Sequence, residues 1–442
     1  MKIQLSDHFT YKKLFIFTLP SIAMMIFTSI YGVVDGYFVS NFVGKTPFAA
    51  INFIYPFIMI LGAFGFMFGT GGSALVSKTL GQGKHEKANK IFSLITLTSV
   101  IVGIVIAVLG ILLIRPLAHA LGARGEMLED CVIYGRILLA AIPFFMLQQE
   151  FQSFFVTAEK PQMGLYTTLI AGFANMILDA LFIAVFKWGL VGAAVATAIS
   201  QVLGGVVPLF YFFTQNTSLL RFTRPNFDSK ALLRTVTNGS SELMGSASMS
   251  IVGMLYNIQL MKYAGEDGVA AYGVMMYVCM IFLAIFIGYS IGTAPIIGYH
   301  FGAQNNSELK SILKKSIISM LITSIAMVLL GEILARPLGL LFIGYDEGVL
   351  SLTVEGFKIF SLHFLFCGMA IFGSGFFTAL NNGLISAIIS FLRTLVFQIA
   401  AVIILPLIFG TNGIWFSIVV AEFMAATLTA LFIITNKKKY NY

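Results

Sequence analysis

Asp35, Asn175, Asp179 and Thr197 are polar residues within strongly apolar stretches of the sequence. Asn175 and Asp179 are four residues apart, so on a helix they lie on one face. If these stretches cross a membrane, each charge near the bilayer centre costs about 2.5–3.5 kcal/mol, so it usually has a function. Two close carboxylates in apolar surroundings can exchange a proton, and together with an amide and a hydroxyl they supply hard oxygen ligands for Na⁺. The residues alone leave both chemistries open.

Asp35 ends a stripe of apolar and aromatic residues. Pro20, Met24, Phe27 and Tyr31 precede it at spacings of three or four residues, which places all five on one helical face. Aromatic rings and methionine sulfur form a soft surface that can repack around planar molecules of different shapes. We therefore expect part of a substrate cavity here, although each residue taken alone is also typical of helix packing.

Glu150 and Glu242 are two further acids in apolar stretches. Both fall in the inner half of their predicted spans, where they could attract a cation in a central cavity. An equally weighted alternative is a buried pair with Arg393 or a hydrogen-bonded packing network. We interpret His363 as a packing residue and assign no function to Glu422. The predicted cavity residues are Met24, Phe27, Tyr31, Met146, Glu150, Phe154, Met176, Glu242, Ser246, Met249 and Asn257.

The composition places these residues in a membrane. Hydrophobic residues make up 58% of the 442 residues, charged residues make up 10%, and the mean hydropathy is +0.92. A soluble protein needs more polar groups than this to cover its surface. Twelve stretches are long enough, at about 1.5 Å per residue, to cross a hydrocarbon core of about 30 Å. The predicted spans are 15–39, 50–77, 91–114, 134–157, 163–186, 190–213, 235–261, 269–298, 312–335, 356–379, 384–408 and 413–435.

The second half of the sequence repeats the first at a constant offset of 221 residues. Arg115-Pro116-Leu117 recurs as Arg336-Pro337-Leu338, and Gly81 recurs as Gly302. A constant offset predicts two structural copies with six spans each. An even number of spans returns the chain to its starting side, so the copies are parallel repeats. The sequence predicts an all-α integral membrane protein with 12 transmembrane helices: an N-terminal lobe (1–213), a cytoplasmic linker (214–234) and a C-terminal lobe (235–442).

The acids near the first lobe's outer side are not repeated in the second lobe. Adding the offset to Asp35, Asn175 and Asp179 gives Tyr256, Val396 and Ala400. A hydrogen-bond network needed only for folding would more plausibly occur in both copies. This asymmetry favours an ion or proton site in the N-terminal lobe over a structural network.

Lysine and arginine are distributed unevenly between the two sides of the predicted spans. Eighteen of the 27 lie on the side of the termini and the linker, eight lie on the opposite side, and Arg393 lies within a span. Positive residues concentrate on the cytoplasmic side. We therefore expect a multi-pass protein of the bacterial cytoplasmic (inner) membrane with both termini in the cytoplasm. The net charge of +8 then reflects loops near anionic lipid, and no nucleic-acid partner is expected.

Other function classes lack their sequence signatures. The chain has no Walker motif, no zinc-type histidine pair and no nucleophile with a base, so we predict neither an ATPase nor an enzyme. Cys131, Cys279 and Cys367 are isolated, so no disulfide framework or metal site is expected. Two unequal lobes offer no ring of equivalent filter residues, which disfavours a channel. We expect no cofactor.

The duplicated lobes, Pro20 with Asp35 on the first span, Asn175 and Asp179 on the fifth, and Thr197 on the sixth resemble the multidrug and toxic compound extrusion (MATE) family. The loops Gly81-Gln82-Gly83 and Gly302-Ala303-Gln304 extend the likeness, which covers the whole chain and points to the MepA-like bacterial branch. The resemblance implies a V-shaped pair of six-helix bundles that exports drugs, often organic cations, against H⁺ or Na⁺. It also implies ion coupling at the acids and the amide, and bending of the first helix at Pro20.

The expected function is therefore a cation-coupled antiporter that exports organic cations and other amphipathic compounds by alternating access. Its partners would be small drug-like molecules and membrane lipids, and it would act as a monomer. Some family members carry an acid in the tenth span, but here that span has His363 and Cys367 and no carboxylate after Glu355. A coupling site of their kind is thus not expected in the second lobe. The alternative is a flippase for a lipid-linked precursor, which would need a more cationic interior.

Overall fold

The computed structural model describes residues 3–214, 216–343 and 347–442, and this part of the chain contains helices and no strands. The first lobe comprises α1 (Tyr11–Phe42), α2 (Lys45–Gly81), α3 (His85–Ala120), α4 (Gly125–Thr157), α5 (Pro161–Asp179), the π-helix η1 (Ala180–Val185) and α6 (Gly189–Phe213). The second comprises α7 (Ser229–Gly302), α8 (Asn306–Ile343), α9 (Glu347–Ser361), α10 (Phe364–Ala379), α11 (Gly383–Phe391), the π-helix η2 (Leu392–Phe397), α12 (Gln398–Phe409) and α13 (Thr411–Tyr440).

These helices account for twelve membrane spans within the described residues. Ten are long and apolar enough to cross a membrane, and α9 with α10 forms an eleventh that is bent by 48°. α7 has 74 residues, far more than one crossing of a core about 30 Å thick needs. Gly265 interrupts it with φ 64° and ψ −155°, a conformation open to glycine but not to other residues, so α7 contains two spans. The predicted all-helical fold with 12 spans is confirmed.

The start of α7 differs from the predicted linker boundary. α7 begins at Ser229, inside the segment 214–234, because the Asp228 carboxylate caps it by accepting a hydrogen bond from the Ala231 N–H at 3.0 Å. The preceding chain packs on the first lobe: Asn89 Oδ1 accepts from the Arg221 N–H, and Ser93 Oγ accepts from the Thr223 N–H, both at 2.9 Å. The connection between the lobes is therefore docked on α3 along part of its length.

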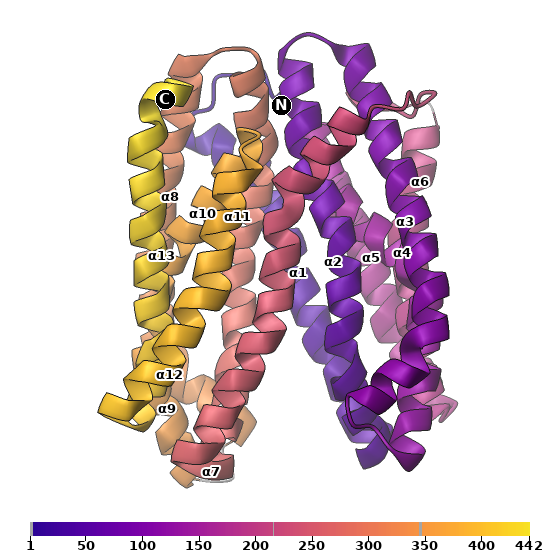
Figure 1. Cartoon of the computed structure of the whole chain (residues 1–442), viewed down its shortest axis with the longest axis vertical. Coiled ribbons are helices and arrows are strands. Elements are labelled where there is room, and N and C mark those ends of the chain that lie inside the picture. The colour runs from indigo at the N-terminus through magenta and orange to yellow at the C-terminus, as the bar shows by residue number, and fades with distance from the viewer. Residues whose placement is uncertain (1–2, 215, 344–346) are drawn as a thin grey trace.

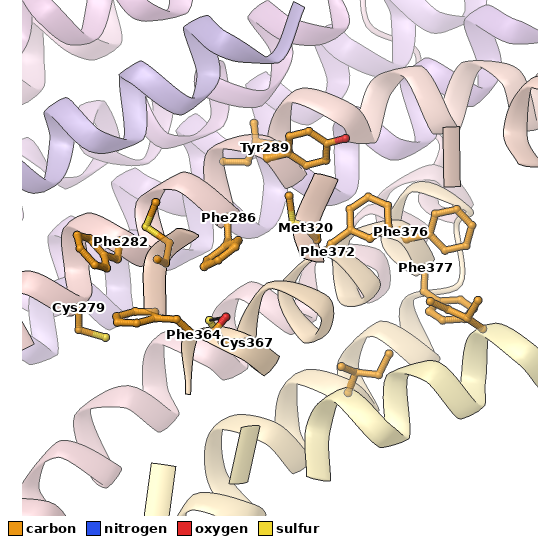
Figure 2. Packing of buried hydrophobic residues seen from close by; sticks show 14 of the residues in the cluster. Cys279, Phe282, Phe286, Tyr289, Met320, Phe364, Cys367, Phe372, Phe376 and Phe377 are labelled. Carbon is orange, nitrogen blue, oxygen red and sulfur yellow. Dashed lines mark hydrogen bonds between the residues drawn. The ribbon is translucent and has the colours of Figure 1, made fainter. Parts of the chain in front are cut away.

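Each lobe has its own packed interior. One cluster of buried side chains is drawn from α1 to α7 and includes Phe92, Phe151 and Phe154. The other is drawn mainly from α7 to α13, and the start of α1 contributes to it as well. Figure 2 shows the second cluster, in which the Phe282 and Phe364 ring centroids are 5.1 Å apart. Aromatic residues fill each bundle, so each lobe can act as a unit.

The two lobes touch at one end and diverge at the other. In Figure 1 the helices of the two bundles lie close together near both termini and spread apart at the opposite end. Glycines make the close end possible, because a Cβ atom on Gly81 would overlap the Tyr299 carbonyl oxygen and one on Gly302 would overlap that of Lys78. Gly71 and Gly239 form a second close contact between α2 and α7. Small residues at helix interfaces permit such backbone approach.

The N-terminal segment, residues 3–9, bridges the lobes at this closed end. The Leu5 N–H donates to Glu159 Oε1 at 2.7 Å, next to the end of α4. The Phe9 N–H donates to Glu308 Oε1 at 2.9 Å, and His8 Nδ1 lies 2.6 Å from Glu308 Oε2, in the first turn of α8. Leu5 and Phe9 are fully buried. The segment therefore makes polar and apolar contacts with both lobes.

Candidate functional site

The acids of the first lobe form a buried cluster between α1 and α5. Asp179 is 0% exposed and Asn175 2% exposed at the end of α5, and the half-buried Asp35 on α1 lies close enough to Asp179 for their carboxyl groups to interact electrostatically. Ionised carboxylates only accept hydrogen bonds, so two of them at close range repel each other unless a proton or a cation lies between them. The structure places these three residues together.

The polar atoms of this cluster are incompletely paired. Within the described chain, no hydrogen bond reaches Asp35 Oδ1, either Asp179 oxygen or either amide atom of Asn175. The Thr197 hydroxyl on α6 is also buried without a hydrogen bond to the described residues. Buried polar groups are usually paired, and leaving one unpaired costs about 1–3 kcal/mol. These atoms are oxygen ligands and hydrogen-bonding groups of the kind that a proton or Na⁺ would use.

A π-helical turn follows the cluster directly. η1 begins at Ala180, the residue after Asp179, and continues α5 to Val185. Such turns widen a helix locally and are frequent at functional sites. The sequence contained no signal for this turn, because η1 is composed of ordinary apolar residues.

The predicted stripe on α1 packs against α5. The Phe27 and Phe173 ring centroids are 5.2 Å apart, and a Cβ atom on Gly172 would lie 3.0 Å from Tyr31 Cδ1. Met24 is 1% exposed beside Gly164. In this conformation the stripe therefore fills the interface between α1 and α5. Met176 is half-buried on α5, next to Asn175.

α1 is one continuous helix from Tyr11 to Phe42, and Pro20 lies within it. Proline lacks the N–H that would bond to the preceding turn and weakens the helix there. The predicted role of Pro20 in bending therefore stays a prediction, which a second conformation of this protein would test.

A cavity of about 390 Å³ lies between the lobes. Its walls come from α1, α2, α4, α7, α10, the span formed by α11, η2 and α12, and α13. Three of the predicted cavity residues, Glu242, Ser246 and Met249, line it. Met25, Phe66 and other apolar residues cover most of the remaining wall.

The other predicted cavity residues lie elsewhere in this conformation. Glu150, Met146 and Phe154 are 0% exposed in the interior of the first lobe, where Glu150 Oε1 accepts from the Thr96 hydroxyl at 2.9 Å. The side chains face α3 because α2 lies against the α4 backbone: a Cβ atom on Gly69 would lie 2.9 Å from Glu150 Cα. Asn257 is exposed on α7, outside the cavity wall.

Arg393 forms an ion pair with Glu422, and no ion pair joins it to Glu150 or Glu242 among the described residues, so the alternative of a buried pair with Arg393 is wrong. Arg393 Nε lies 3.0 Å from Glu422 Oε1 and 2.8 Å from Oε2. Sequence reasoning missed the partner because the two residues are on consecutive spans, 29 positions apart. The neighbouring contact from the Tyr256 hydroxyl to Gln398 Oε1, at 2.8 Å, was also missed. Tyr256 occupies the repeat position of Asp35, which was the available signal.

His363 is 1% exposed within the second lobe. Its Nδ1 is 2.5 Å from the Phe360 carbonyl oxygen, and its Nε2 is 3.6 Å from Cys279 Sγ. Both ring nitrogens thus have neighbours inside the lobe, which agrees with the interpretation of His363 as a packing residue.

Comparison with known proteins follows the same two-part organisation. The MatE family model matches residues 20–181 and 243–404, two segments of equal length. The multidrug export protein MepA of Staphylococcus saprophyticus is 26% identical over 428 residues, covering 96% of this chain and 93% of that protein. A MATE crystal structure in complex with MaL6 superposes with a TM-score of 0.93 at 22% identity, with 98% of both chains covered. The outward-facing conformation of a multidrug resistance MATE family transporter gives 0.92 at 22% identity, covering 98% of this chain and 97% of that one.

Proposed function

This chain belongs to the MatE family, and we propose that it is a multidrug exporter of the bacterial cytoplasmic membrane, driven by inward movement of H⁺ or Na⁺. The relative named above is a multidrug export protein, which supports this class of cargo. The observation that carries the coupling proposal is the buried cluster of Asp35, Asn175 and Asp179 with unpaired polar atoms.

The arrangement of the lobes supports an outward-open state. The glycine contacts hold the lobes together at the end that carries the termini, and the distribution of positive residues favours a cytoplasmic location for that end. The cavity between the lobes then opens on the opposite, external side. Cargo would leave from this state, and closure at the external end would expose the cavity to the cytoplasm.

The coupling step uses the differential affinity of two conformations for one ion. A proton or Na⁺ that reaches Asp35 and Asp179 removes the repulsion between their carboxylates and allows α1 to pack on α5. The aromatic stripe on α1 moves with Asp35, so the ion changes the surface available to cargo. A ligand can shift such an equilibrium only by its difference in affinity between the two states.

The flippase alternative predicts a different cavity wall. A lipid-linked precursor with phosphate groups needs an excess of cationic side chains. Glu242 and Glu422 line this cavity together with a single basic residue, Arg393, among the described residues. The excess of acidic groups favours cationic cargo.

Transport in proteoliposomes tests the proposal. We expect a fluorescent organic cation to move under an imposed H⁺ or Na⁺ gradient, and Asp35→Asn to lower the gradient-driven rate at least about tenfold because the amide cannot exchange the ion. Asp267→Asn, at an exposed position on α7, is the matched control and should transport normally. Absence of gradient-driven transport by folded, inserted protein would refute the proposal. Normal transport by Asp35→Asn would refute the coupling role.

A further inference from the structure

The second lobe presents three charged or polar side chains with unused hydrogen-bonding atoms to the central cavity. Glu242 on α7, Arg393 on η2 and Gln398 on α12 all line it. Glu242 accepts hydrogen bonds, while the arginine and the glutamine amide nitrogen donate them. The second lobe therefore presents one acidic side chain and two hydrogen-bond donors to the same cavity.

Arg393 has donors left over after it binds Glu422. Its Nε donates to both Glu422 oxygens, while Nη1 and Nη2 make no hydrogen bond to the described part of the chain. The two terminal nitrogens carry four of the five N–H groups of the guanidinium. Arg393 keeps 16% of its side chain exposed, whereas Glu422 keeps 4%. The end of the guanidinium is thus free to bind a planar oxyanion from the cavity.

Two other side chains that line the cavity, Gln398 and Glu242, limit the charge of the ligand that Arg393 can bind. Gln398 Oε1 accepts from Tyr256, and the amide nitrogen has no bond to any described residue, so it is a second donor. The Glu242 carboxylate has no hydrogen bond within the described chain and lies within electrostatic range of Arg393. Glu242, Arg393 and Glu422, when ionised, sum to one negative charge. A simple anion is therefore repelled. A molecule that carries both a cationic group and a carboxylate can interact with Glu242 through the first and with Arg393 through the second.

Helix packing alone does not require the Arg393–Glu422 pair. The positions 221 residues earlier are Gly172 and Gln201, so the first lobe packs with no charge at either place. Breaking a buried ion pair is costly, but replacing both members together is often tolerated. A pair that only one lobe carries, and that is open to the cavity, is suited to binding.

We propose that Arg393 is the residue of the central cavity that binds a carboxylate group on the cargo. The carboxylate of the ligand binds the free end of Arg393 and the Gln398 amide, and any cationic group of the ligand faces Glu242. Glu422 positions Arg393 by holding Nε. The inference rests on the proposed export function for the role of carboxylate-bearing molecules as cargo, and it names the residue that recognises the carboxylate.

The test compares two dyes that differ in one carboxylate: rhodamine B, a zwitterion, and its ethyl ester, a cation. Binding of each dye to purified protein is measured by fluorescence polarisation, and transport of each dye is measured in proteoliposomes. The variant Arg393→Gln with Glu422→Gln removes both charges, so no buried charge is left unpaired. We expect affinity for rhodamine B to fall about 10- to 100-fold, because charged hydrogen bonds are lost, and affinity for the ester to change less than about threefold. Arg136→Gln, which removes an exposed arginine from α4, should change neither.

The proposal would be overturned if the double variant lost affinity equally for both dyes, or lost affinity for neither. Wild-type protein that binds both dyes equally would do the same, because Arg393 would then add nothing to recognition. Transport of neither dye would count against the proposed function alone, since the ratio of binding affinities still decides whether Arg393 recognises a carboxylate.

Discussion

At the residue scale, the Arg393–Glu422 ion pair predicts that a single substitution lowers the stability of the protein more than the double substitution does. Glu422→Gln leaves a buried arginine without its counter-charge, so we expect the free energy of unfolding to fall by about 3–5 kcal/mol. Arg393→Gln with Glu422→Gln removes both charges and should cost clearly less. Thermal unfolding of the protein in detergent measures the difference. A double variant that is less stable than Glu422→Gln would contradict the argument.

At the element scale, the contacts of the N-terminal segment predict that one carboxylate helps to hold the lobes together at the closed end. Glu308→Gln weakens the hydrogen bonds to the Phe9 N–H and His8, and the loss of charge-assisted bonding should cost about 1.5–3 kcal/mol. Residues 3–9 should then exchange amide hydrogen faster, as measured by mass spectrometry. Glu86→Gln, at an exposed pair with Lys90, is the matched control and should leave exchange unchanged. Unchanged protection in Glu308→Gln would show that apolar contacts alone hold the segment.

At the scale of the whole molecule, the glycine contacts between α2 and α7 predict that added bulk opens the closed end. Gly71→Ala would place a methyl group on the Thr235 carbonyl oxygen, so the lobes must separate there. We expect the conformational equilibrium to shift away from the state seen in this structure, as measured by distances between spin labels on α2 and α7 near the closed end.

The control for this substitution is Gly273→Ala, because a Cβ atom at Gly273 meets nothing within 4 Å. It should keep the distance distribution of the wild type and slightly stabilise the helix, by about 0.5–1 kcal/mol. An identical distribution for Gly71→Ala and the wild type would mean that the closed end can absorb a methyl group without moving.

The sequence by itself determined the membrane environment, the duplication and the number of spans, because these follow from hydropathy, length and a constant offset. It also singled out Asp35, Asn175 and Asp179, since polar groups in apolar helices stand out without knowledge of their neighbours. Only the tertiary structure decided which groups meet. Arg393 and Glu422 are brought together by packing of consecutive spans, and Glu150 is turned toward Thr96 rather than the cavity. Hydropathy and spacing describe one helix at a time, whereas a cavity wall depends on the rotation of each helix against its neighbours.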